Sequence, residues 1–161
     1  MPHVALYAGS FDPITNGHTD LIKRSLGFVD KLVVAVAVNL QKQSLFSTEE
    51  RERLIKAALD NDPRVEVRSF EGLLVEFALS LDVPVLIRGL RAVSDYEYEY
   101  QMALMNRHLA PAMETVFMVP SLDTTYISSS MVREVAQFGG DIRSLVHPMV
   151  ADALKRKFAG G

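Results

Sequence analysis

The chain has 161 residues, 48% of them hydrophobic, and a formal net charge of −3, so we expect residues 1–161 to form one globular domain. The acidic balance argues against a nucleic-acid partner, which needs a basic face, and no apolar run approaches the roughly 20 residues that cross a membrane. There is no cysteine, which excludes disulfides and thiolate metal sites, and the amino terminus lacks a secretory pattern, so we expect a cytoplasmic protein.

Short β-rich runs alternate with longer helical patterns along the whole chain. The runs that we expect to be strands are 4–8, 32–38, 65–69, 83–87 and 115–119. Their nearly continuous Val, Leu, Ile and Ala content is typical of parallel strands buried on both faces. The pattern therefore predicts an α/β fold, a Rossmann-like doubly wound domain with a five-stranded parallel sheet. Ligands of such sheets bind beyond the carboxyl ends of the strands, where segments 9–18, 39–46, 88–91 and 120–130 are expected to form one crevice.

The segment 9–18, Gly-Ser-Phe-Asp-Pro-Ile-Thr-Asn-Gly-His, joins the first strand to a helical pattern and is the strongest functional signal. Its glycines permit close approaches, and a helix starting near His18 aims free N–H groups and the positive end of its dipole at an anion. The spacing matches neither common phosphate loop, G-x-G-x-x-G or G-x-x-x-x-G-K-[ST]. It resembles the His-x-Gly-His loop of the nucleotidyltransferase superfamily, with Thr15 in place of the first His.

The segment 39–46 follows the second strand and contains Lys42. This lysine could reach the crevice as a flexible point charge, although on its own a loop lysine more often stays solvated. Ser47 and Glu50 then form a capping box before a helix expected over residues 51–59.

Arg-Gly-Leu-Arg at 88–91 directly follows the fourth strand and brings two guanidinium groups to the same sheet edge. Their planar forks suit phosphate oxygens. The alternative is a pair of surface salt bridges with Asp95, Glu97 or Glu99, and only the position at the end of the strand favours phosphate binding.

Asp95 is expected to cap the next helix, which runs to about Leu109. Tyr96, Tyr98 and Tyr100 alternate within it, and packing at a helix or subunit interface explains them better than base stacking.

The segment 124–130, Thr-Thr-Tyr-Ile-Ser-Ser-Ser, precedes a helical pattern over 131–138 that Gly139 and Gly140 close. Hydroxyls and free amides at a helix amino terminus indicate a second anion site. Capping by one serine is the alternative, and both roles can coexist. A last helix is expected over 149–158.

Six motifs appear in order: the 9–18 segment, the Lys42 loop, Ile-Arg-Gly-Leu-Arg at 87–91, Tyr-Glu-Tyr-Glu at 96–99, Met-Asn-Arg-His at 105–108 and Ile-Ser-Ser-Ser at 127–130. Together they cover essentially the whole chain and resemble the family of bacterial phosphopantetheine adenylyltransferases. The resemblance implies an enzyme with a single nucleotidyltransferase domain. This enzyme transfers the adenylyl group of ATP to 4′-phosphopantetheine and forms dephospho-coenzyme A and pyrophosphate in coenzyme A synthesis.

The resemblance also implies residue roles, with His18, Lys42 and Arg91 as the catalytic candidates. His18 would contact the α-phosphate, Arg91 would hold ATP, and Lys42 with Arg88 would hold the acceptor phosphate. The implied ATP-binding residues are Ser10, Phe11, His18, Gly89, Leu90, Arg91, Glu99, Thr124, Thr125, Tyr126, Ile127, Ser128, Ser129 and Ser130. The implied 4′-phosphopantetheine-binding residues are Ser10, Lys42, Leu73, Leu74, Arg88, Met105 and Asn106. Thr124 and Thr125 depart from the family, because some members carry an aromatic residue there.

The acceptor phosphate is already an anion at neutral pH, so an in-line attack on the α-phosphorus needs no strong base and no covalent enzyme intermediate. We expect Mg²⁺ on the β- and γ-phosphates, held mainly by ATP oxygens and water, because the sequence shows no carboxylate cage for a metal. The family resemblance further implies a homohexamer and feedback inhibition by coenzyme A.

Two alternatives remain open from the sequence. One is a nicotinamide mononucleotide adenylyltransferase or a cytidylyltransferase. The preferred acceptor distinguishes these enzymes from a phosphopantetheine adenylyltransferase. The other is a non-catalytic sensor of nucleotides or coenzyme A. The joint presence of His18, Lys42, Arg88 and Arg91 counts against a sensor, since binding alone does not require all four groups.

Overall fold

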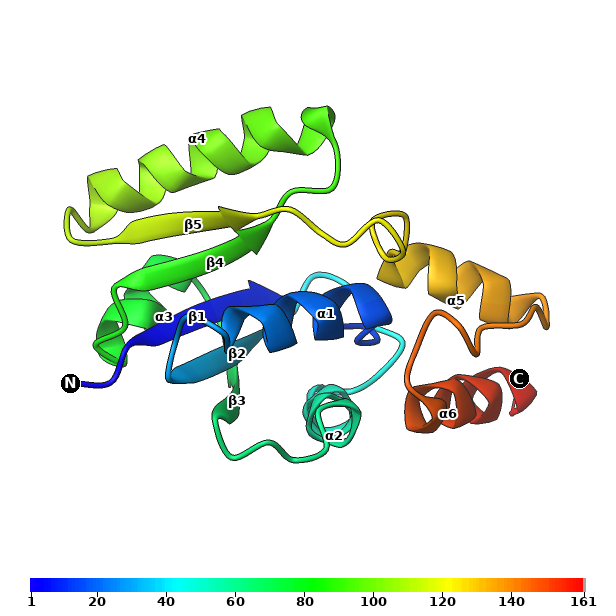
Figure 1. Ribbon diagram of the computed structural model, residues 1–161. Coiled ribbons are helices and arrows are strands. Elements are labelled where there is room, and N and C mark those ends of the chain that lie inside the picture. Colours follow the sequence, from blue (N-terminus) through cyan, green and yellow to red (C-terminus); the bar gives the residue numbers. More distant parts are fainter. Residues whose placement is uncertain (161) are drawn as a thin grey trace.

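A five-stranded parallel sheet forms the centre of the computed structural model, which describes residues 1–160 (Figure 1). The strands are β1 Val4–Gly9, β2 Lys31–Ala37, β3 Val65–Phe70, β4 Val85–Gly89 and β5 Glu114–Met118. They lie in the order β3-β2-β1-β4-β5, and each neighbouring pair is parallel. The predicted α/β fold with a five-stranded parallel sheet is confirmed, and every strand begins and ends within two residues of its predicted bounds.

Within residues 1–160, six helices connect and cover the strands. They are α1 Asn16–Ser25, α2 Thr48–Ala58, α3 Leu74–Ser80, α4 Val93–Leu109, α5 Ser129–Gln137 and α6 Pro148–Ala159. None of the helices in residues 1–160 has the length and apolar content needed to cross a lipid bilayer.

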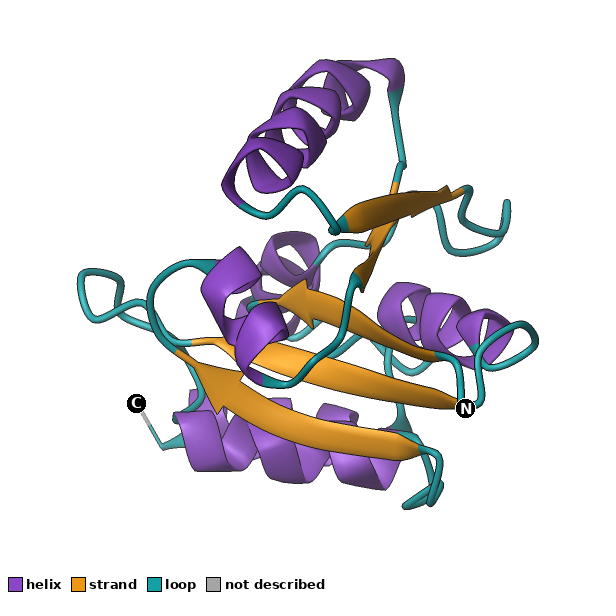
Figure 2. Ribbon diagram, turned by 90° about the vertical axis from the view of Figure 1, so that its left-hand side faces the viewer, coloured by secondary structure: helices purple, strands orange, loops and turns teal. Residues whose placement is uncertain are grey.

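The sheet buries side chains on both faces, and Figure 2 shows helices on both sides of it. Along β1, Ala5 and Tyr7 belong to one hydrophobic cluster, whereas Leu6 and Ala8 belong to another, as the alternation of a strand requires. The first cluster includes apolar residues of α1, α2, α5 and α6, and the second includes those of α3. This burial on both faces explains the continuous apolar runs in the sequence.

The helix starts confirm one predicted cap and correct another. Ser47 and Glu50 form the expected capping box at the start of α2. Asp95 does not cap α4, because the helix begins at Val93 with Ala92 at the cap position and no side-chain cap. Asp95 lies in the first turn, and its carboxylate accepts a hydrogen bond from the backbone N–H of Arg91 at 3.3 Å. Asp95 therefore satisfies the backbone N–H of Arg91, a group just before the helix that has no hydrogen-bond partner within the helix.

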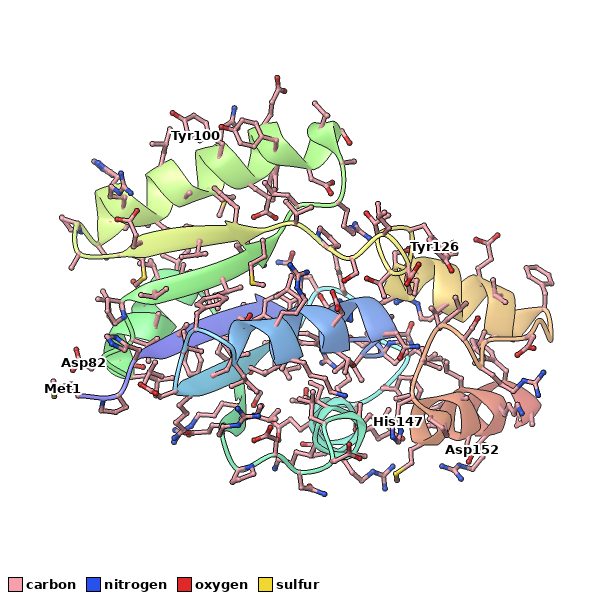
Figure 3. The ribbon with its side chains drawn as sticks, in the orientation of Figure 1. Met1, Asp82, Tyr100, Tyr126, His147 and Asp152 are labelled. Atoms are coloured by element: carbon pink, nitrogen blue, oxygen red, sulfur yellow. The ribbon has the colours of Figure 1, made fainter. Side chains whose placement is uncertain are left out.

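The predicted tyrosine stripe lies on α4 and is largely exposed. Tyr96 and Tyr100 stack with ring centroids 5.8 Å apart, and Tyr100 lies on the outer side of α4 (Figure 3). Glu99 is the one buried residue of this helix.

Candidate active site

Two adjoining cavities lie at the carboxyl ends of β1 and β4. The larger cavity has a volume of about 410 Å³ and is lined by residues of segments 9–18, 88–91 and 120–130. The smaller cavity measures about 220 Å³ and is lined by Phe70, Leu74, Met102 and Ala103, among others. The two cavities share five lining residues, which are Ala8, Gly9, Ser10, Arg88 and Glu99. Three of the four predicted segments thus meet, while segment 39–46 lines neither cavity.

The loop after β1 turns sharply to reach the larger cavity. Phe11 has a backbone φ of 47°, in the left-handed region that residues with a side chain rarely adopt, and the Asp12–Pro13 peptide is cis. The Phe11 ring is buried and packs edge-on against Tyr7 and His18, with centroids 5.5 and 5.0 Å away. Gly17 allows a close approach, since a Cβ there would lie 3.4 Å from the carbonyl oxygen of Thr124. The first and last loops of the site therefore pack directly against each other.

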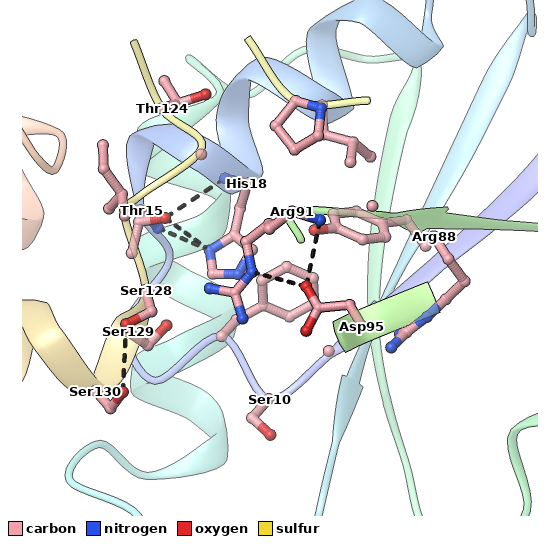
Figure 4. A pocket seen from close by; sticks show the side chains of 18 of the residues that line it. Ser10, Thr15, His18, Arg88, Arg91, Asp95, Thr124, Ser128, Ser129 and Ser130 are labelled. Carbon is pink, nitrogen blue, oxygen red and sulfur yellow. Dashed lines mark hydrogen bonds and ion pairs between the residues drawn. The ribbon is translucent and has the colours of Figure 1, made fainter. Parts of the chain in front are cut away.

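His18 lies in the first turn of α1 and faces the larger cavity (Figure 4). Its Nδ1 accepts a hydrogen bond from the backbone N–H of Thr15 at 3.0 Å, which leaves the proton on Nε2. Burial, and then the nearby charge of Arg91, lower the pKa of His18 to about 4. The imidazole is therefore neutral at pH 7 and can donate from Nε2–H.

Both arginines of segment 88–91 line the larger cavity and also pair with carboxylates. Arg88 donates from Nε and Nη2 to the Glu99 carboxylate at 2.9 and 2.7 Å, and from Nη1 to the Ala8 carbonyl at 3.0 Å. The pKa of Arg88 is raised, mainly by its hydrogen bond with Glu99. Arg91 Nε lies 3.8 Å from an Asp95 carboxylate oxygen (Figure 4). Arg88 and Arg91 thus pair with carboxylates, as the salt-bridge interpretation predicted, and they also line the cavity at the end of the strand.

The serine run at the start of α5 caps the helix and lines the larger cavity. Ser128 Oγ accepts from the backbone N–H of Met131 at 3.2 Å, and Ser129 Oγ donates to the Pro13 carbonyl at 2.8 Å. Ser128, Ser129 and Ser130 all line the cavity. Capping is confirmed, and binding of an anion stays a prediction.

The remaining predicted site residues divide into three groups. Phe11, Gly89, Thr124 and Ile127 line the larger cavity. Leu74 and Asn106 line the smaller one. Lys42, Leu73, Leu90, Met105, Thr125 and Tyr126 line neither cavity, so their predicted contacts stay predictions. Lys42 is exposed, and its backbone N–H donates to the Asn39 carbonyl at 3.2 Å.

Sequence reasoning missed several lining residues. Arg133 of α5 lines the larger cavity, and its Nη1 donates to the Asp12 carbonyl at 2.6 Å. Arg133 follows Ser129 by four residues, so both lie on the same face of α5, and this spacing could have identified Arg133 from the sequence. Tyr7 also lines this cavity, and burial raises the pKa of its phenol to about 12. In the smaller cavity the missed residues are Ala8, Ala37, Phe70, Tyr98, Met102, Ala103 and Thr115.

Comparison with known proteins gives consistent matches over most of the chain. Residues 6–135 match the family model described as cytidylyltransferase-like. The chain is 53% identical over 157 residues to the phosphopantetheine adenylyltransferase of Anaeromyxobacter dehalogenans (strain 2CP-C), covering 98% of this chain and 96% of the relative. It is 52% identical over 155 residues to the protein of that name from Clostridium tetani (strain Massachusetts / E88), covering 96% and 97%.

One solved structure extends the comparison to the fold. A crystal structure from Vibrio parahaemolyticus, described as a nicotinate-nucleotide adenylyltransferase, superposes with a TM-score of 0.72. The alignment covers 97% of this chain and 93% of the other at 17% identity, so the likeness concerns the fold alone.

Proposed function

The chain belongs to the phosphopantetheine adenylyltransferases, within the cytidylyltransferase-like nucleotidyltransferases, and from this membership we propose how its two cavities share one reaction. The enzyme transfers the adenylyl group of ATP to 4′-phosphopantetheine and forms dephospho-coenzyme A and pyrophosphate. The larger cavity holds ATP, and the smaller cavity holds the pantetheine arm. The observation that carries this division is the wall formed by Ser10 and Arg88, which belongs to both cavities.

The lining of each cavity suits its proposed substrate. The larger cavity collects cationic and dipolar groups: His18, Arg91, Arg133 and the N-terminal turns of α1 and α5. The smaller cavity is bordered by Phe70, Leu74, Met102 and Ala103, whose apolar surfaces suit an extended, uncharged arm. Phosphates of both substrates then meet beside Ser10, which lines both cavities.

The reaction follows from charge and position. An oxygen of the acceptor phosphate attacks the α-phosphorus of ATP, a new P–O bond forms, and the bond to the β-phosphate breaks with pyrophosphate as the leaving group. Neutral His18 donates Nε2–H to a non-bridging α-phosphate oxygen, while Arg91 offsets the developing negative charge. Arg88 and Lys42 hold the acceptor phosphate in line, and the exposed loop of Lys42 has to approach the cavities for this.

A divalent metal fits this site only through the substrate. Residues 1–160 contain no group of three or more His, Cys, Asp or Glu side chains that could hold a metal ion. We therefore propose that Mg²⁺ binds to the phosphate oxygens of ATP and to water, where it neutralises phosphate charge.

The exposed face of α4 supports the homohexamer as a further proposal. Tyr98, Met102, Met105 and Leu109 are large apolar side chains exposed on one face of this helix. Light scattering after size exclusion measures the assembly, and a monomer at micromolar concentration would refute the hexamer.

Coenzyme A is proposed as a feedback inhibitor, because it carries the same pantetheine arm as the acceptor. We place the enzyme in the cytoplasm, where ATP is available.

The first test is pyrophosphate release from ATP and Mg²⁺ with 4′-phosphopantetheine, with nicotinamide mononucleotide or without an acceptor, and with mass detection of the product. Dephospho-coenzyme A formed with the first acceptor alone is the expected result. Product from nicotinamide mononucleotide would favour the other acceptor, and ATP binding without any product would favour a sensor.

A second test addresses the division between the cavities. Ala103→Phe fills the smaller cavity, so KM for 4′-phosphopantetheine rises at least about tenfold while KM for ATP changes little. Leu104→Phe, the next residue on α4 and outside both cavities, is the matched control. An equal rise in both KM values for Ala103→Phe would refute the proposed division.

A further inference from the structure

Arg51 of α2 is a buried cation without a carboxylate partner. Its exposed fraction is 4%, and it takes part in none of the ion pairs within residues 1–160. Its Nε is buried and has no hydrogen-bond partner among the described residues. Burying a charge under these conditions is costly, and a purely structural position is filled more cheaply by an apolar side chain. The residue therefore calls for a functional explanation.

The contacts of Arg51 join two loops that border the cavities. Nη1 donates to the Ser10 carbonyl at 2.9 Å and to the Ala37 carbonyl at 3.1 Å. Nη2 donates to Thr48 Oγ1 at 3.3 Å, which anchors the guanidinium to the start of α2. Ser10 lines both cavities, and Ala37 ends β2, from which the Lys42 loop departs. The Nη1 atom of Arg51 thus links the start of the loop after β1 to the end of β2, where the Lys42 loop begins.

The Ser10 carbonyl is a position where the backbone needs support. It belongs to the peptide unit that enters Phe11, whose φ of 47° is unfavourable for a residue with a side chain. A hydrogen bond from a charged donor holds this carbonyl more firmly than a neutral one. On the far side of the turn, the Asp12 carboxylate accepts from the backbone N–H groups of Leu45 and Phe46, both at 2.9 Å. Hydrogen bonds therefore connect the loop after β1 to the segment after β2 both before and after the turn at Phe11.

We propose that Arg51 is a positioning residue of the adenylyl transfer. It touches neither substrate and acts through Ser10 and Ala37, keeping the nucleotide loop and the Lys42 loop in the register that aligns the two phosphates. Its charge, which no protein carboxylate neutralises in residues 1–160, adds positive potential beneath the phosphate positions. This inference rests on the proposed function and deepens it.

The test compares Arg51→Lys and Arg51→Met with wild type. Arg53→Met is the matched control, because Arg53 lies on the same helix, is exposed and lines neither cavity. We measure kcat and both KM values per ATP-binding site, counted by equilibrium binding of ATP, together with the Tm of the free protein. Arg51→Lys keeps the charge but not the fork, so we expect kcat per site to fall about tenfold, and on the order of 100-fold for Arg51→Met. Both KM values change less than about threefold.

Loss of folded protein alone would give another pattern. If the variants have fewer ATP-binding sites and a lower Tm but wild-type kcat per site, Arg51 is merely structural and the inference is wrong. If Arg51→Met does not fold, Arg51→Lys decides: wild-type kcat per site overturns the inference, and a reduced kcat with unchanged ATP affinity supports it. A wild-type protein that forms no dephospho-coenzyme A refutes the proposed function instead, so the two failures are distinct.

Discussion

The neutral state of His18 makes a quantitative prediction about stability. Its pKa falls from 6.5 to about 4 in the folded protein, because the ring is buried and Arg91 lies nearby. Between these two values the unfolded chain binds a proton that the folded chain does not bind. Stability therefore rises with pH from about 4 to 6.5 and is independent of His18 above that range.

The magnitude follows from the difference between the two pKa values. One pKa unit corresponds to about 1.4 kcal/mol, so complete protonation of the unfolded state costs the fold about 3 kcal/mol. By pH 4.5, most of this stability has been lost relative to pH 7.5. His18→Gln removes the titrating ring and with it this contribution to the slope.

Urea denaturation of wild type and His18→Gln from pH 7.5 to 4.5, at one protein concentration, measures the effect. Carboxylates with lowered pKa, such as Glu50, Asp62 and Glu66, destabilise both proteins as the pH falls, so their effect cancels in the difference. The free energies of unfolding should approach or cross as the pH falls, with wild type losing roughly 2 to 3 kcal/mol more. Parallel curves would show that folded His18 accepts its proton at an ordinary pH and would refute the neutral donor.

Three further predictions concern turnover and packing. His18→Ala lowers kcat by about 100- to 1000-fold while the ATP dissociation constant changes little, and equal losses in both would contradict its proposed contact with the α-phosphate. Glu99→Ala leaves the half-buried Arg88 guanidinium without its carboxylate and lowers the free energy of unfolding by about 2 kcal/mol. Chemical denaturation measures this loss, and a double variant with Arg88→Met should lose less than the sum of the two single variants. Ser47→Ala removes the acceptor for the Glu50 amide and costs about 1 kcal/mol, seen as a lower Tm, and an unchanged Tm would show that the cap is dispensable.

Local patterns were enough to predict the strands and several helix ends. The apolar runs identified β1, β2 and β4, because a strand buried on both faces needs apolar residues at nearly every position, and this demand is visible without the rest of the fold. The edge strands β3 and β5 also carry polar residues, and their β-branched and aromatic residues identified them. Ser47 with Glu50 identified the start of α2, since a capping box involves residues only three apart. The arrival of Ser10, His18, Arg88 and Ser128 in one place followed from the rule that parallel strands end at the same edge.

Contacts between residues distant along the chain were decided only by the tertiary structure. The sequence offered three carboxylates for Arg88, and the packing of α4 against β5 brought Glu99, eleven residues away, to the guanidinium. Nothing local indicates that Arg51 donates to Ser10, 41 residues earlier, or that Arg133 donates to Asp12, 121 residues earlier. By itself the sequence determined the strands, the loops at their ends and the family, because these depend on residue type and short spacing. The partners of Arg51, Arg88 and Arg133 depend on how separate elements pack, because a hydrogen bond forms only within about 3 Å.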